Sequence, residues 1–252
     1  MNRRCFACWI LLVAFGGVLS AQRGLPPIDI IGVEPMEFGE VVRGAPFSAE
    51  ATTEMIQELR DGNRIERRST VTIARDSTGR TRREQSLPPI GPVVLDPEVR
   101  MITISDPRQR TLYLIDPQRR TVSRSTVPSD PPRPPGDRGG GSRALPPPQM
   151  SSEALGNKQI LGLHAEGTRQ TMTIPAGVFG NVGPIQVVTE RWHSPELKIV
   201  LESSRSDPRL GDVTYRVTSL VRAEPDAALF AIPSDYTTVE RPPRAFGPPP
   251  PR

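Results

Sequence analysis

Short stretches rich in Thr, Ile, Val and Tyr alternate with turn-forming phrases along this 252-residue chain, and this rhythm constrains its fold most strongly. One phrase occurs twice, ten residues apart, as "DPRQRT" at 106–111 and "DPQRRT" at 116–121. Asp at the first position of a β-turn bonds to the backbone two residues on, and Pro at the second fixes φ near about −65°. A ten-residue period fits a strand of about six residues and a four-residue turn. We therefore interpret the repeat as two turns, not as a duplicated Asp/Arg site.

Other turn signals divide the rest of the chain in the same way. Asp61-Gly62-Asn63 predicts a hairpin, although the residues before it, 49–59, also fit a short helix. Residues 76–79 predict the next turn, and Asp207-Pro208 with Gly211 separates two alternating strands at 196–205 and 212–221. No long helix is predicted, and residues 225–230 favour a single helical turn. The pattern predicts a mainly β fold.

The first 21 residues are typical of a signal peptide. Arg3 and Arg4 precede an apolar run, and Leu19-Ser20-Ala21 offers small residues for cleavage after Ala21. A retained anchor is the alternative, but spanning a membrane takes about 20 apolar residues. Cleavage predicts a periplasmic or secreted protein that is not an integral membrane protein. It also removes Cys5 and Cys8, so the mature chain has no thiol for a disulfide, a nucleophile or a metal site.

Three segments are too rich in Pro and Gly to form a packed core. Residues 127–150 contain eight Pro and four Gly, which predicts a disordered linker inside the fold. We expect a loosely structured segment at 22–46 and a disordered Pro-rich tail at 241–252. Between them, residues 47–240 are predicted to form a single β domain that the linker interrupts.

The composition excludes several classes of function. Removing Arg3 and Arg4 leaves 30 basic against 28 acidic residues, a net +2 that does not favour nucleic acid. His164 and His193 lie in no ligand-spaced cluster, and no serine-hydrolase elbow or calcium loop occurs. Gly177, Gly180 and Gly183 are followed by Pro184 instead of a helix, so we expect a loop there. We predict no enzymatic activity, no cofactor and no metal.

The hairpin after residue 63 is dense in arginine. Its seven Arg residues are Arg64, Arg67, Arg68, Arg75, Arg80, Arg82 and Arg83. They fit an acidic partner or anionic lipid heads, and equally a solvated sheet face balanced by Glu66, Asp76 and Glu84.

Alternating apolar positions on three predicted strands supply the candidate site. Period-two alternation sends every second side chain to one face of a sheet, and the turn near Asp207 places two of these strands side by side. We expect one face to gather Leu112, Leu114, Leu197, Ile199, Leu201, Val213, Tyr215 and Val217.

Residues 45–126 and 152–240 resemble a large group of uncharacterised exported bacterial proteins. The phrases that carry the resemblance are "DGNRIERRSTVTIARDSTGRTRRE" and the run from "GTRQTMTIPAG" to "PSDYTTVE". More broadly, "YLIDPQRRTV" and "PDAALFAIPSDY" are similar to the lipoprotein-carrier-like (LolA-like) half-barrel. That resemblance implies a curved antiparallel sheet around an apolar cavity.

Together these features predict a non-enzymatic envelope protein that binds a lipid, an acyl chain or another apolar ligand on the concave face. The alternative is an interaction or sensory module that binds another envelope protein through the sheet edge and the Arg-rich hairpin.

Overall fold

The computed structural model describes residues 41–86, 100–126 and 147–240, which form twelve strands and one short 3-10 helix. The first six strands are β1 (Phe47–Glu58), β2 (Arg64–Arg75), β3 (Thr81–Ser86), β4 (Arg100–Asp106), β5 (Thr111–Asp116) and β6 (Thr121–Thr126). The remaining elements are β7 (Gln149–Ile160), β8 (Leu163–Ile174), β9 (Ile185–Ser194), β10 (Ile199–Asp207), β11 (Gly211–Val221), η1 (Ala227–Phe230) and β12 (Thr237–Glu240).

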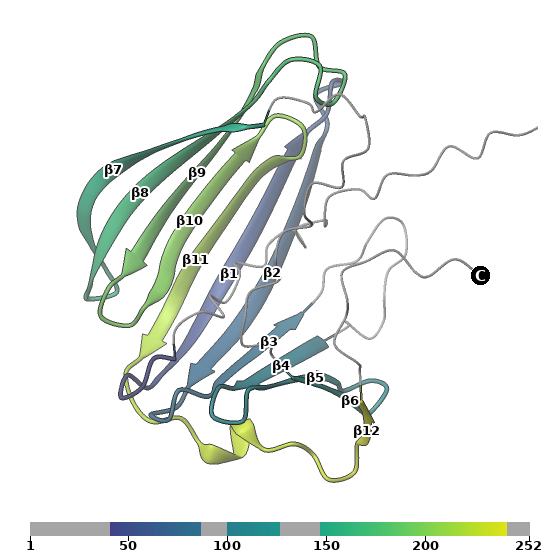
Figure 1. Ribbon diagram of the computed structural model, residues 1–252, viewed down its shortest axis with the longest axis vertical. Coiled ribbons are helices and arrows are strands. Elements are labelled where there is room, and N and C mark those ends of the chain that lie inside the picture. Colours follow the sequence, from purple (N-terminus) through teal and green to yellow (C-terminus); the bar gives the residue numbers. More distant parts are fainter. Residues whose placement is uncertain (1–40, 87–99, 127–146, 241–252) are drawn as a thin grey trace, which may run out of the picture. The chain divides into compact units, whose positions relative to one another are not determined.

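All twelve strands belong to one open, curved sheet, ordered β12-β6-β5-β4-β3-β2-β1-β11-β10-β9-β8-β7 (Figure 1). Every ladder is antiparallel except the short β12–β6 pair, which is parallel. The mainly β fold is therefore confirmed, and within the described residues η1 is the only helical element. Strands from both sides of residues 127–146 share the sheet, because β1 pairs with β11 in its middle. Among the described residues, no helix is long and apolar enough to cross a bilayer.

The Asp-Pro phrases are turns, as predicted. The Asp106 carboxylate accepts hydrogen bonds from the backbone N–H groups of Arg108 and Gln109, at 2.9 and 3.1 Å, between β4 and β5. Asp116 repeats the arrangement between β5 and β6. Each turn ends on a residue with positive φ, Arg110 at 51° and Arg120 at 52°. The duplicated phrase thus builds two copies of one hairpin connection.

The Asp61-Gly62-Asn63 turn joins β1 and β2 as a hairpin of two twelve-residue strands. Asn63 donates its backbone N–H to the Asp61 carboxylate at 3.0 Å, and Gly62 has a φ of 81°. The helical alternative for residues 49–59 is wrong, because β1 runs through Phe47–Glu58 and pairs along its length with β2. Buried and exposed residues alternate along β1 with a period close to two, as in a strand, and not with the 3.6-residue period of a helix.

The register of the ladders divides the sheet into two faces. Directly paired residues share a face, and Ala51 pairs with both Val71 and Val217. We call the face that carries these residues and Tyr215 the Tyr215 face. Following the pairs outward through β3 and β4 brings Leu112 and Leu114 of β5 onto this same face. The residues between them on each strand point to the opposite side, which we call the Phe230 face.

A small core lies on the Phe230 face. Ile104, Ile115 and Val122 are each at most 2% exposed, and Phe230 of η1 packs onto them at 6% exposure. Asp226 caps η1 by accepting the Ala228 backbone N–H at 2.9 Å. Burying one such aromatic side chain contributes about 1.5–3 kcal/mol. Figure 1 shows η1 on the outer side of the bend in the sheet, which leaves the Tyr215 face on the concave side.

Several sequence predictions lie outside the described residues: the signal peptide at 1–21, most of the 22–46 segment, the linker through residue 146 and the 241–252 tail. The structure does describe residues 41–46 and 147–150, at the borders of two of these segments. Residues 41–46 form no strand, β1 begins at Phe47, and β7 already begins at Gln149, inside the segment assigned to the linker.

A strap pocket beside the concave face

The eight predicted site residues differ in their position relative to the Tyr215 face. Val213, Tyr215 and Val217 share that face on β11, and Leu201 joins them because its β10 neighbour on the same side, Ser203, pairs with Tyr215. Leu201, Tyr215 and Val217 are 0, 4 and 3% exposed, so they belong to a packed core. Leu112, Leu114, Ile199 and Val213 are half-buried.

Strict alternation through Leu197, Ile199 and Leu201 does not occur, because a turn and a bulge interrupt it. Residues Ser194 to Lys198 form a turn in which the Ser194 hydroxyl accepts the Leu197 backbone N–H at 3.3 Å. β10 starts only at Ile199, and its register with β9 shifts between Val200 and Glu202. This shift places Ile199 on the face of Glu202, across the sheet from Leu201.

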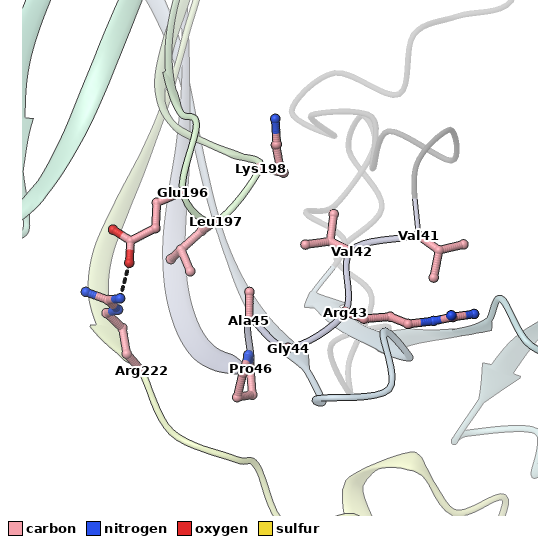
Figure 2. A pocket seen from close by; sticks show the side chains of 10 residues that line it. All are labelled: Val41, Val42, Arg43, Gly44, Ala45, Pro46, Glu196, Leu197, Lys198 and Arg222. Carbon is pink, nitrogen blue, oxygen red and sulfur yellow. Dashed lines mark hydrogen bonds and ion pairs between the residues drawn. The ribbon is translucent and has the colours of Figure 1, made fainter.

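Leu197 nevertheless lines a pocket. The pocket has a volume of roughly 520 Å³ and lies between residues 41–46, which we call the strap, and the β9–β10 turn (Figure 2). Its lining residues are Val41, Val42, Arg43, Gly44, Ala45, Pro46, Glu196, Leu197, Lys198 and Arg222. Leu197 is only 2% exposed and belongs to the same apolar cluster as Tyr215, and Ala45 packs against that cluster. The floor of the pocket is therefore continuous with the core on the concave face.

Arg75 joins the strap to the turn. Its Nε and one Nη donate to the Ala45 carbonyl oxygen at 3.0 and 2.8 Å, and the same Nη donates to the Leu197 carbonyl oxygen at 2.8 Å. The guanidinium carbon also lies 4.8 Å from the centre of the Phe47 ring. Burial lowers the pKa of Arg75, yet an Arg side chain stays charged in proteins. One buried cation thus ties together three segments at the pocket wall.

Sequence analysis missed this role, because it counted Arg75 among the arginines of one hairpin. The signal was available: Arg75 lies in phase with Val71 and Ile73, which face the core. Other arginines of the hairpin do pair with acids as expected, including Arg64 with Glu66 and Arg82 with Glu84.

The strap is also held at its glycine. Gly44 has a φ of 69° and donates its N–H to the Ser77 carbonyl oxygen at 3.0 Å. Gly79, with a φ of 91°, approaches so closely that a Cβ there would lie 3.0 Å from the Val42 carbonyl oxygen. The β2–β3 turn therefore supports the strap from below. It is itself rigid, because Asp76 accepts bonds from Thr78 and Arg80.

Four charged residues are among those that line the pocket, and we call them the rim: Arg43, Glu196, Lys198 and Arg222. Glu196 forms an ion pair with Arg222, drawn in Figure 2. Within the described part of the chain, the side chains of Arg43 and Lys198 have no hydrogen-bond or ion-pair partner, and both residues are exposed. The same part of the chain contains no group of three or more potential metal-ligating side chains. The pocket therefore combines the buried Leu197 as its floor with a rim of net positive charge.

Comparisons with known proteins bear on the fold. No protein-family profile matches the chain, and no curated protein matches it. Among solved structures, an uncharacterized conserved protein from Thermus thermophilus matches with a TM-score of 0.41 and 11% identity, over 79% of this chain and 91% of that one. The MucA/MucB complex of Pseudomonas aeruginosa matches with a TM-score of 0.40 and 13% identity, over 82% of this chain and 62% of that one.

A LolA superfamily protein from Nitrosomonas europaea matches with a TM-score of 0.29 and 9% identity, over 75% of this chain and 91% of that one. All three matches have low identity and low TM-scores, so nothing about the family, activity or partners of these proteins is carried over to this chain.

Proposed function

We propose that this protein is an exported, non-enzymatic binding protein of the cell envelope that holds an apolar ligand, such as a lipid or acyl chain, in the strap pocket and along the adjoining concave face. The observation that carries the proposal is the continuity between pocket and core at Leu197, which lines the pocket and belongs to the same buried apolar cluster as Tyr215. A volume of roughly 520 Å³ falls within the range of small-molecule pockets, about 300–1,000 Å³.

The arrangement of the eight site residues refines this proposal. Leu201, Tyr215 and Val217 form the support beneath the ligand, because their side chains are already packed. Leu197, at 2% exposure, closes the floor of the pocket, and the strap valines Val41 and Val42 provide the contact surface. Export is supported by the signal-peptide pattern of residues 1–21.

Binding of an apolar fluorescent dye tests the proposal with a matched pair of variants. Val41 lines the pocket at 44% exposure, whereas Leu210 lies in the β10–β11 turn at 45% exposure and is absent from the pocket lining. Val41→Glu should weaken dye binding about tenfold or more, because the ligand would have to desolvate a carboxylate. Leu210→Glu introduces the same charge at the same exposure and should leave binding unchanged. Equal effects of both variants, or no dye binding by the wild type, would contradict the proposal.

A second candidate function is binding of another envelope protein through the sheet edge and the Arg-rich hairpin. The observation that favours it is the length of β7, which pairs only with β8 among the described strands and is exposed over most of its twelve residues. An edge of this kind can accept a further strand. A Pro in place of Ser152 would disrupt such pairing while leaving dye binding intact. Loss of a co-purifying partner in this variant would favour the second function.

A further inference from the structure

We propose that the strap pocket selects an amphiphile whose polar end is an anion, a carboxylate or a phosphate, with its apolar chain on the Leu197 side. This inference rests on the proposed function and adds the chemistry of the head group.

The charge at the rim favours an anion. Three cations, Arg43, Lys198 and Arg222, line the pocket with a single carboxylate, Glu196, so the lining carries a net charge of +2. Glu196 is already engaged by Arg222. Arg43 and Lys198 retain their full donor capacity within the described part of the chain. Ammonium and guanidinium groups form their strongest hydrogen bonds with carboxylate and phosphate oxygens.

The β9–β10 turn sets the head-group cation beside the apolar floor. Lys198 has a φ of 55°, a left-handed conformation that is uncommon outside glycine, and its backbone N–H donates to the Ser194 carbonyl oxygen at 2.8 Å. The turn buries Leu197 and exposes the next side chain, Lys198. In Figure 2 the Lys198 side chain extends away from the Glu196–Arg222 pair. The turn thus places a cation next to the buried floor residue, beside the strap valines that would contact the chain of an amphiphile.

A neutral or cationic head group fits this rim less well. A hydroxyl gains little from two unpaired cations, and an ammonium is repelled by a net positive lining. Since the rim is exposed, we expect the preference to be moderate and to weaken with salt.

Competition against an apolar dye, with the full mature protein, separates these possibilities. The probes are dodecanoate, dodecanol, dodecylammonium and inorganic phosphate. We expect dodecanoate to bind roughly tenfold more tightly than dodecanol, dodecylammonium to bind more weakly than dodecanol, and phosphate at millimolar concentration to displace no dye. Equal affinity for the three chains would overturn the head-group inference while leaving the proposed function intact. Displacement of the dye by inorganic phosphate alone would overturn the inference that the ligand needs an apolar chain. Failure of every chain would contradict the proposed function itself.

Variants of the rim residues test whether they cause the preference for an anionic head group. Lys198→Gln and Arg43→Gln should each reduce dodecanoate affinity about three- to tenfold and dodecanol affinity by less, and the double variant should remove the preference. Arg108→Gln is the control: Arg108 is exposed in the β4–β5 turn, and its backbone bond to Asp106 does not need the side chain. A preference that survives in the double variant, or that Arg108→Gln reduces equally, would contradict the assignment to Arg43 and Lys198.

Discussion

The guanidinium of Arg75 donates a hydrogen bond of 2.8 Å to the carbonyl oxygen of Leu197, a residue 122 positions away in the sequence. The same side chain holds Ala45 of the strap. Through these contacts the end of β2 fixes the two walls of the pocket. The geometry of the pocket therefore depends on a residue that does not line it and that was not among the predicted apolar positions.

Replacing this residue gives the first prediction. Arg75→Lys should destabilise the fold by about 2–4 kcal/mol, because a single ammonium cannot satisfy both buried carbonyl oxygens in the fork geometry of Arg. It should also weaken dye binding, since the strap loses its link to the turn. Urea unfolding measures the first effect and a dye titration the second. Arg64→Lys, at an exposed site, should change neither; if Arg75→Lys behaved in the same way, the role assigned to Arg75 would be wrong.

The second prediction concerns glycine at two turns. Gly211 has a φ of 94°, and a Cβ there would lie 2.3 Å from the Ile56 carbonyl oxygen. Gly62 has a φ of 81°, but a Cβ there would meet nothing within 4 Å. Gly62→Ala should cost about 1–2 kcal/mol from backbone strain alone. Gly211→Ala should cost about 1–3 kcal/mol more, because β1 must move to accept the methyl group.

Thermal or urea unfolding of the two variants measures the difference. Equal losses of stability would show that the β10–β11 turn does not approach β1 as closely as described.

Both glycines follow turn signals that the sequence displays plainly, and this is why most of the sheet could be predicted. A Pro directly follows each of Asp106, Asp116 and Asp207 in the sequence, so local residues are enough to predict these turns. The Ser194-Pro195 turn uses a hydroxyl in place of the carboxylate, and the strand predicted at 196–205 begins inside this turn, whereas β10 begins only at Ile199.

The bulge and the pocket could not be predicted from the sequence, because both depend on contacts between distant segments. The bulge beside Leu201 depends on how β10 pairs with β9. The pocket depends on the strap, and nothing in the sequence of residues 41–46 indicates that Arg75 will hold them. Periodicity assigned Val213, Tyr215 and Val217 to one face, but it does not reveal which positions a packed core fills and which a pocket leaves open.

Acidification provides the third prediction. Asp207 is 2% exposed; burial alone would raise its pKa, but hydrogen bonds from Arg209 and the charges of Arg209 and Arg205 outweigh it and hold the pKa below its ordinary value of 3.8. Asp76 is held low in the same way by Arg80 and Thr78. A depressed folded-state pKa contributes stability that is present above the unfolded pKa and is lost as pH falls through the folded value.

Stability should therefore be constant near neutrality and decline as the pH falls below about 5. Asp207→Asn should be less stable than the wild type at pH 7, and its decline with acid should be shallower. Urea unfolding across this pH range measures both. If stability declined with acid equally steeply in Asp207→Asn and in the wild type, Asp207 would not contribute to the decline.

The fourth prediction follows from the central β1–β11 ladder. A specific protease site inserted within residues 127–146 would cut the chain between β6 and β7. The two fragments should stay associated in buffer, because β1 and β11 remain paired between Ser48 and Ile56. Size-exclusion chromatography before and after cleavage measures this. Fragments that separate without denaturant would contradict a shared sheet.

The central claim is that the strap pocket holds an apolar ligand, and native mass spectrometry of the mature protein isolated from its own envelope tests it most directly. We expect a mass increment matching a lipid or acyl compound in the wild type, retained in Leu210→Glu and lost or strongly reduced in Val41→Glu. A wild-type protein that carries no such increment, or an increment that Val41→Glu and Leu210→Glu retain equally, would contradict it.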